Sequence, residues 1–275
     1  MGTSQNPGLV IQDGSLTQLN MGISGQFSVP RSPQGRPVIF QAGDSEEGRE
    51  FAAASADAIF SRHGTLAEGR PFYADVKRRL AKYGRTPDQL LILPAATFVL
   101  GDTDADAAEL ARVVRRQQVS GQTAMAFLEQ LWNRDLSGYD PDGPLPDVDP
   151  DPGEHTIARG RASVRMYRDP MATAAQWRAK AEAEKLSIRD LIIEVTGRQT
   201  FIGSPSTVAG AINHLVQADA SDGFILVPHI TPGGLDEFAD RVVPMLQERG
   251  VYRSEYAGST LREHLGLAPL TGSAA

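Results

Sequence analysis

The side chains best placed for chemistry lie in one segment, QAGDSEEGRE, at residues 41–50. An apolar run ends where this segment starts, Gly43 lets the backbone turn, and a helical pattern then begins. Asp44 or Ser45 stands where a helix N-cap is expected, and the free N–H groups of a helix N-terminus can bind a phosphate. The alternative is that Ser45 only caps the helix. The pattern alone favours this alternative, because capping Ser and Asp residues are common.

Histidines are the other candidates for acid–base chemistry. The five in this chain show no HExxH or paired metal-ligand spacing, and with no cysteine a thiolate metal site is excluded, so we expect no metal site. His63 and His229 each follow a predicted strand, which in a barrel would place both at the C-terminal mouth, where catalysis occurs. Each is a candidate catalytic residue, and the alternative for each is a structural histidine.

Residues 137–170 form a long stretch rich in Pro, Asp and Gly. Its carboxylates suggest calcium, but the EF-hand order, with a central Gly and a terminal Glu, is absent. The prolines favour a solvated, semi-rigid loop instead. Long insertions of this kind commonly act as lids or binding loops, so we expect this one to cover a substrate.

Short apolar runs alternate with helical patterns along the rest of the chain. Such runs suit strands buried on both faces, and strand–helix–strand order implies a parallel sheet. We predict an α/β fold with four strands, within residues 37–41, 57–61, 90–100 and 223–227. Helices are expected over residues 46–55, 66–83, 104–132, 171–185, 187–196, from 204 onward, and over 235–249. Asp104 is a suitable N-cap for the third of these helices.

Composition limits the kind of partner. The 275 residues are 41% hydrophobic, which allows a sizeable core, and the net charge is −7 (27 − 34) with no basic cluster. We therefore expect neither nucleic acid nor membrane as a partner. The N-terminus lacks the pattern of a signal peptide, and the longest apolar stretch, 90–100, is shorter than the about 20 residues that span a bilayer. These features predict a cytoplasmic protein.

Several segments, in consistent order, resemble one family. It is the bacterial luciferase-like FMN-dependent monooxygenases, in the branch of nitrilotriacetate monooxygenase, pristinamycin synthase and dibenzothiophene-sulfone monooxygenase. The resemblance runs from about residue 24 to 268, and its most specific segments are residues 27–60, 137–146, 203–228 and 232–266.

The resemblance implies a TIM (β/α)8 barrel that binds reduced FMN, supplied by a separate NAD(P)H:flavin reductase, and uses O2 to oxidise a small organic substrate. It also implies a homo-oligomer. By this resemblance, Ser45 matches the serine that binds the flavin phosphate after the fifth strand. Gly43 and Gly48 shape the same loop, and Asp44 lies in it.

The resemblance also places residues 37–41 at the fifth strand, so that the four predicted strands are strands five to eight. The 36 preceding residues are too few for four βα units of about 30 residues each. We therefore expect only the C-terminal half of the barrel, together with its long insertion. The expected parts are an irregular lead-in segment at 1–36, the half barrel at 37–268 with its insertion at 137–170, and a tail at 269–275.

Two functions remain open on this basis. The first is a monooxygenase of small organic substrates. If this chain is a truncated part of that enzyme, it is inactive alone. The second is a non-catalytic remnant that self-associates through its open sheet edges, because unpaired strand edges invite pairing with another chain.

Overall fold

A computed structural model describes residues 4–12, 15–23, 32–153, 169–197 and 200–270. The chain divides into two compact units. The terminal unit comprises residues 1–38 and 257–275, and the sheet unit comprises residues 39–256. None of the described helices is both long and apolar enough to cross a membrane.

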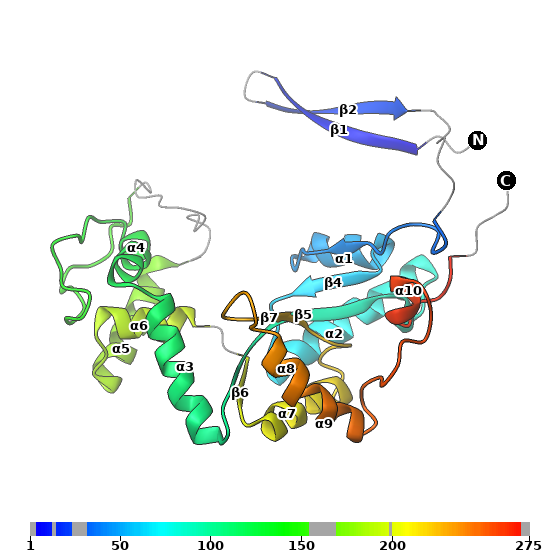
Figure 1. Ribbon diagram of the computed structural model, residues 1–275. Helices are drawn as coiled ribbons and strands as arrows, with labels where there is room; N and C mark the ends of the chain where they lie inside the picture. Colours follow the sequence, from blue (N-terminus) through cyan, green and yellow to red (C-terminus); the bar gives the residue numbers. More distant parts are fainter. Residues whose placement is uncertain (1–3, 13–14, 24–31, 154–168, 198–199, 271–275) are drawn as a thin grey trace. The chain divides into compact units, whose positions relative to one another are not determined.

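The sheet unit is built on a parallel sheet (Figure 1). Its strands are β3 (Phe40–Gln41), β4 (Ala58–Ser61), β5 (Leu91–Leu100), β6 (Phe201–Gly203) and β7 (Ile225–Val227). β3 pairs with β4, and β4 pairs with the first half of β5. Further along β5, β7 pairs with residues 95–97 and β6 with residues 98–100. The parallel α/β sheet is confirmed, and β6 is a fifth strand that the sequence analysis misses.

Helices follow the strands as expected. In the sheet unit they are α1 (Glu46–Ser55), α2 (Leu66–Leu80), α3 (Asp104–Gln118), α4 (Gly121–Trp132), α5 (Pro170–Glu184), α6 (Ile188–Thr196), α7 (Pro205–Gln217), α8 (Asp236–Arg241) and α9 (Val243–Glu248), with short 3-10 helices η1 (Ala81–Tyr83) and η2 (Pro87–Gln89).

Two expected helices are interrupted. The helix predicted over 104–132 breaks between α3 and α4, where the Ser120 hydroxyl accepts a hydrogen bond from the Thr123 N–H and starts a new helix. The helix predicted over 235–249 breaks at Val242, just before a proline that has no N–H to donate to the preceding turn.

Asp104 is not the N-cap of its helix. Thr103 takes that place in a reciprocal capping box with Asp106. The Asp104 carboxylate instead accepts a 2.7 Å hydrogen bond from the Ser204 N–H and another from the Thr207 hydroxyl. It therefore ties the start of α3 to the start of α7.

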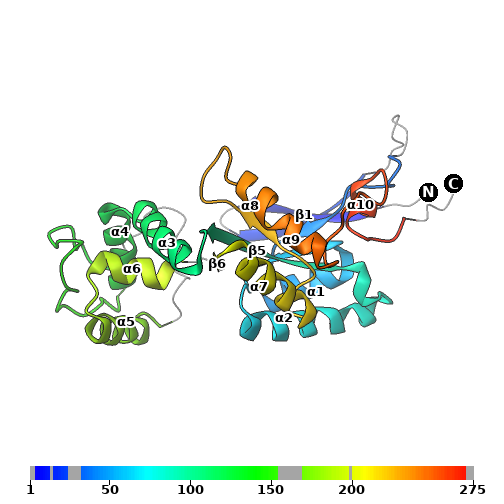
Figure 2. The same ribbon diagram turned by 60° about the horizontal axis from the view of Figure 1, so that its bottom comes forward.

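Helices cover one face of the sheet. Helices α7, α8 and α9 lie side by side (Figures 1 and 2). Ile59 and Ile92 pack with side chains of α1 and α2, and Phe98 packs with side chains of α7, α8 and α9. Side chains alternate between the two faces of a strand. Residues of β5 and β7 on the other face, such as Thr97 and Val227, remain partly exposed.

Helices α4, α5 and α6 pack together around their own apolar cluster. Trp132 and Trp177 lie in this cluster with ring centroids 6.3 Å apart. The Trp132 Nε1–H donates a 2.8 Å hydrogen bond to the carbonyl of Val148, which anchors the predicted insertion loop. Residues 137–153 have no helix or strand, as expected, whereas residues 154–168 of the insertion lie outside the described part of the chain.

The terminal unit differs from the irregular segment expected over 1–36. β1 (Ser4–Gln12) and β2 (Ser15–Ile23) pair antiparallel. The sequence carries a signal for this hairpin, because Asp-Gly between two apolar segments is a frequent hairpin turn. Helix α10 (Leu261–His264) belongs to the same unit, and the Arg262 N–H donates a hydrogen bond to the side-chain oxygen of Gln34.

Candidate functional site

The turn from β3 to α1 is formed by the motif at residues 41–50. A Cβ on Gly48 would lie only 2.8 Å from the carbonyl carbon and oxygen of Gly43. A Cβ on Gly43 would lie 2.5 Å from the Gln41 side-chain nitrogen. The first turn of α1 therefore packs directly on the backbone of the loop, and Gly48 has no room for a side chain, whereas a side chain at Gly43 would require the Gln41 side chain to move.

Ser45 is the N-cap of α1, as predicted. Its Oγ accepts a 3.1 Å hydrogen bond from the Gly48 N–H. In a helix, the first N–H groups have no carbonyl partner within the helix, so those of Glu46 and Glu47 point out of the N-terminus. The Glu46 carboxylate lies 3.7 Å from the Arg79 guanidinium on α2, which directs this acid away from the helix end.

An ion pair joins this turn to the residue after β4. Arg62 donates to one carboxylate oxygen of Asp44 from both Nε, at 3.2 Å, and Nη2, at 2.9 Å. The hydrogen bond from Arg62 lowers the pKa of Asp44, so this carboxylate is ionised at neutral pH. Two consecutive strand-to-helix turns thus meet at the carboxyl end of the sheet.

His63 lies beside this ion pair. Its ring stacks on Phe72 of α2, with centroids 4.2 Å apart and planes inclined by 17°. The Nδ1 atom is buried and has no hydrogen-bond partner among the described residues. Burial lowers the pKa of His63, so the imidazole is neutral at neutral pH and can accept or donate one hydrogen bond.

A pocket of about 600 Å³ collects these groups. It is lined by Asp44, Arg62, His63, Gly64, Thr65, Glu68, Ala95, Thr97, Gly197, Thr200 and Val227. Thr97 and Thr200 hold one wall together, since each hydroxyl accepts from the other residue's N–H, at 3.0 and 3.4 Å. The pocket therefore lies where β4 and β7 end and against β5, on the face of the sheet opposite the described helices that pack on Ile59, Ile92 and Phe98.

The other candidate histidine is placed differently. His229 follows β7 as expected, but it is exposed and is not among the residues that line this pocket. The structure thus brings His63 together with Asp44 of the predicted motif, and leaves His229 apart from them.

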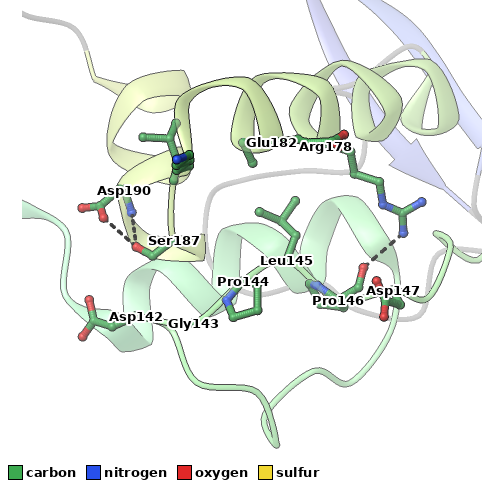
Figure 3. A pocket seen from close by; sticks show the side chains of 13 residues that line it. Asp142, Gly143, Pro144, Leu145, Pro146, Asp147, Arg178, Glu182, Ser187 and Asp190 are labelled. Carbon is green, nitrogen blue, oxygen red and sulfur yellow. Dashed lines mark hydrogen bonds between the residues drawn. The ribbon is translucent and has the colours of Figure 1, made fainter.

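A second pocket, of about 790 Å³, lies between the insertion loop and helices α5 and α6 (Figure 3). Several of its polar groups already have partners within the chain. Arg178 donates to the carbonyl of Pro146, and Ser187 donates to Asp190 (Figure 3). We favour the smaller pocket as the functional site, because ligands of parallel α/β folds bind at the carboxyl ends of the strands.

No metal centre accompanies either pocket in the described ranges. There, no group of three or more His, Asp or Glu side chains is arranged to hold an ion. The chemistry open to the smaller pocket is therefore that of one guanidinium, two carboxylates, one neutral imidazole and several hydroxyls.

Comparison with known proteins identifies the family. The model of the luciferase-like monooxygenases matches residues 18–222. Nitrilotriacetate monooxygenase component A of Aminobacter aminovorans is 38% identical over 249 residues, which are 90% of this chain and 52% of the relative. Dibenzothiophene-sulfone monooxygenase of Rhodococcus erythropolis is 34% identical over 251 residues, which are 90% of this chain and 52% of the relative.

A solved structure has the same fold. Riboflavin lyase (RcaE), solved with modified FMN and its substrate riboflavin, is 26% identical with a TM-score of 0.61, over 98% of this chain and 54% of that chain. The chain belongs to the luciferase-like monooxygenase family, and the predicted TIM-barrel class of fold is confirmed. The chain spans about half the length of the curated relatives it matches.

Among the site residues that the sequence does not predict are Arg62, Thr97 and Thr200. Arg62 belongs to no recognisable motif, and its partner Asp44 is 18 residues away in the sequence. Thr97 lies inside an apolar strand, and Thr200 precedes the strand that the sequence analysis misses. The one available signal for Arg62 is its place directly after a predicted strand, next to His63.

Proposed function

We propose that this chain forms part of an FMN-dependent monooxygenase, which uses reduced FMN and O2 to oxidise a small organic substrate. The observation that carries this proposal is the turn from β3 to α1. There Ser45 and the first N–H groups of α1 face the carboxyl end of a parallel sheet. A helix N-terminus at this edge is a recurrent binding site for a phosphate.

The residues present fit a flavin phosphate. Gly48 packs on the Gly43 backbone without a side chain, so the first turn of α1 and the loop before it lie close together. Ser45 is exposed there, and Glu46 is directed toward Arg79. The adjoining pocket of about 600 Å³ has a volume typical of small-molecule sites.

Reduced FMN, when bound, would supply electrons to O2, and the oxygen so activated would oxidise the substrate. The residues of this chain would place and shield the flavin. The Ser45 hydroxyl would donate a hydrogen bond to the phosphate, while Gly43, Asp44 and Gly48 shape the loop. His63, held neutral against Phe72, would give or take a hydrogen bond in the pocket.

A wider assembly follows from the same resemblance. A separate NAD(P)H:flavin reductase would supply the reduced FMN, and the chain would act as a homo-oligomer. We further propose that β3, β4, β5 and β7 correspond to strands five to eight of the barrel, with the three-residue β6 as an addition at the end of β5. In support, the matches cover about half of each relative, and Thr97 and Val227, on the face of the sheet opposite the described helices, are partly exposed.

An anaerobic titration with reduced FMN tests the proposal directly. We expect saturable binding, weakened about tenfold by Ser45→Ala, because a hydrogen bond to a charged group contributes about 1.5–3 kcal/mol. Ser120→Ala is the matched control, since Ser120 is also an exposed N-cap with a 3.1 Å hydrogen bond and lies on α4. Absence of binding by the unmodified chain would refute the proposal.

A second candidate is a non-catalytic module that self-associates. The observation favouring it is the pair of sheet edges: β3 and β7 each pair with only one other described strand. Phe40 on β3 is 48% exposed and Val227 on β7 is 43% exposed. Open parallel edges with exposed apolar side chains invite pairing with another chain.

Sedimentation analysis separates the two candidates. Self-association predicts oligomers that form without flavin and that Val227→Lys dissociates, because a charge cannot be buried at the joined edge. Val251→Lys serves as the control, since Val251 is similarly exposed but lies after α9, outside the sheet. Monomers at all concentrations would exclude this candidate.

A further inference from the structure

Arg62 joins the two strand-to-helix turns that meet at the pocket. Its guanidinium contacts the carboxylate of Asp44, the residue directly before the Ser45 N-cap. This contact holds a positive charge beside the start of α1. The resemblance to the monooxygenase family assigns no role to Arg62.

The charges around the start of α1 show what Arg62 compensates. Three carboxylates, those of Asp44, Glu46 and Glu47, lie within the turn and the first helical positions. Glu46 is drawn toward Arg79, and Asp44 is neutralised by Arg62. Without Arg62, the carboxylate of Asp44 would repel any anion bound at the adjacent N–H groups.

Arg62 is also free to bind a second acceptor. Both of its hydrogen bonds to Asp44 go to a single carboxylate oxygen and use two of the five N–H donors of a guanidinium. Its side chain is 61% exposed, so a rearrangement toward a bound anion breaks no packed contact of the core. Among the described residues that line the pocket, it is the one Lys or Arg.

We propose that Arg62 is the residue that makes this site prefer the phosphorylated flavin, FMN, over riboflavin. The inference rests on the proposed function and concerns the phosphate end of the same site. Arginine suits this task because its planar guanidinium can donate two parallel hydrogen bonds to the oxygens of one phosphate. Riboflavin has no phosphate and gains nothing from this charge.

The test compares two ligands on three variants and the unmodified chain. Reduced FMN and reduced riboflavin are each titrated anaerobically, at low and at high salt. We expect Arg62→Gln to weaken FMN binding about tenfold, as the loss of a charge-assisted hydrogen bond implies, and to change riboflavin binding less than about twofold. Arg62→Lys should restore part of the preference, because it keeps the charge but loses the fork.

Arg112→Gln is the matched control. Arg112 also forms an exposed ion pair, with Glu109, in the middle of α3 and away from the pocket. It should leave both affinities unchanged. Added salt should weaken FMN binding to the unmodified chain but not to Arg62→Gln, since salt screens exposed charges. Circular dichroism and thermal melting check that each variant remains folded.

The outcomes distinguish a failure of the role inferred for Arg62 from a failure of the proposed function. Equal weakening of both flavins by Arg62→Gln would show a structural role for Arg62 and would overturn the inference. Unchanged binding of FMN would overturn it as well. In either case the proposed function would stand, because the unmodified chain still binds FMN. If the unmodified chain bound neither flavin, the proposed function would fail, and this inference with it.

Discussion

A nearly buried ion pair holds the start of β5 to the helix side of the sheet unit, and its loss gives the clearest test of the fold. The Asp222 carboxylate accepts hydrogen bonds from Lys77 Nζ at 2.8 Å, the Ile92 N–H at 2.7 Å and the Tyr73 hydroxyl at 3.0 Å. Lys77 also donates to the carbonyls of Pro87 and Leu90. The side chains of Lys77 and Asp222 are 9% and 20% exposed.

We expect Asp222→Ala to lower the free energy of unfolding by about 3 kcal/mol. Removing one partner of a buried ion pair costs about 3–5 kcal/mol, and the 20% exposure of Asp222 places this pair at the low end of that range. The cost arises because Lys77 keeps its charge without a counterion, while the Ile92 N–H and the Tyr73 hydroxyl lose their acceptor.

Urea unfolding measures this effect as a shift in midpoint at constant slope. Asp240→Ala is the control, because Asp240 is an exposed residue of α8, and we expect a change below about 0.5 kcal/mol. The double variant Lys77→Met/Asp222→Leu should recover part of the loss, since it removes both charges and fills the space. A loss below about 1 kcal/mol for Asp222→Ala would contradict the reasoning.

Three further predictions follow from single contacts. Gly48→Ala should destabilise α1 and abolish FMN binding in the titration, because the added methyl would lie 2.8 Å from the Gly43 backbone. Arg85→Ala should lower the free energy of unfolding by about 2 kcal/mol, measured in urea, because its guanidinium donates to the carbonyls of Ala53 and Ala56 at the end of α1. The pKa of His63 is lower in the folded chain, so the unfolded chain binds a proton at this histidine more tightly. The contribution of neutral His63 to stability is therefore lost as the pH falls below the ordinary histidine pKa of about 6.5. His63→Phe should therefore reduce the loss of melting temperature between about pH 7 and pH 5.

The sequence predicts the elements of the sheet unit where their signals are local. The helix at 46–55 begins and ends as predicted, and its start follows from a local signal, because Ser45 caps it. β6 is missed since its three residues are defined only by pairing with the end of β5. The break before α4 is missed because the apolar pattern continues across Ser120.

The candidate site is predictable to the same extent. The turn containing Ser45 is visible because glycine, cap and acidic first turn are neighbours in sequence. The contrast between His63 and His229 is not visible in the sequence, because both histidines follow strands and differ only in what packs on them. Phe72, on the next helix, stacks on His63 and buries it, whereas His229 is exposed. Such partners are chosen by tertiary packing, which one sequence does not reveal.

One mismatch between sequence and structure bears on the proposed half barrel. Residues 91–100 read LILPAATFVL, an apolar run of the kind found in strands buried on both faces. In the structure the helix-facing side chains Ile92, Ala96 and Phe98 are buried. On the other face Leu93 and Val99 are buried as well, whereas Leu91, Ala95 and Thr97 are only half-buried. Val227, the β7 partner of Thr97, lines the candidate pocket on this second face and is exposed. The partial exposure of apolar side chains around the pocket, on a strand composed for burial on both faces, supports the proposed half barrel, in which a further layer of chain would close over the pocket. That layer would also exclude water from the flavin, as oxidation in a shielded site requires.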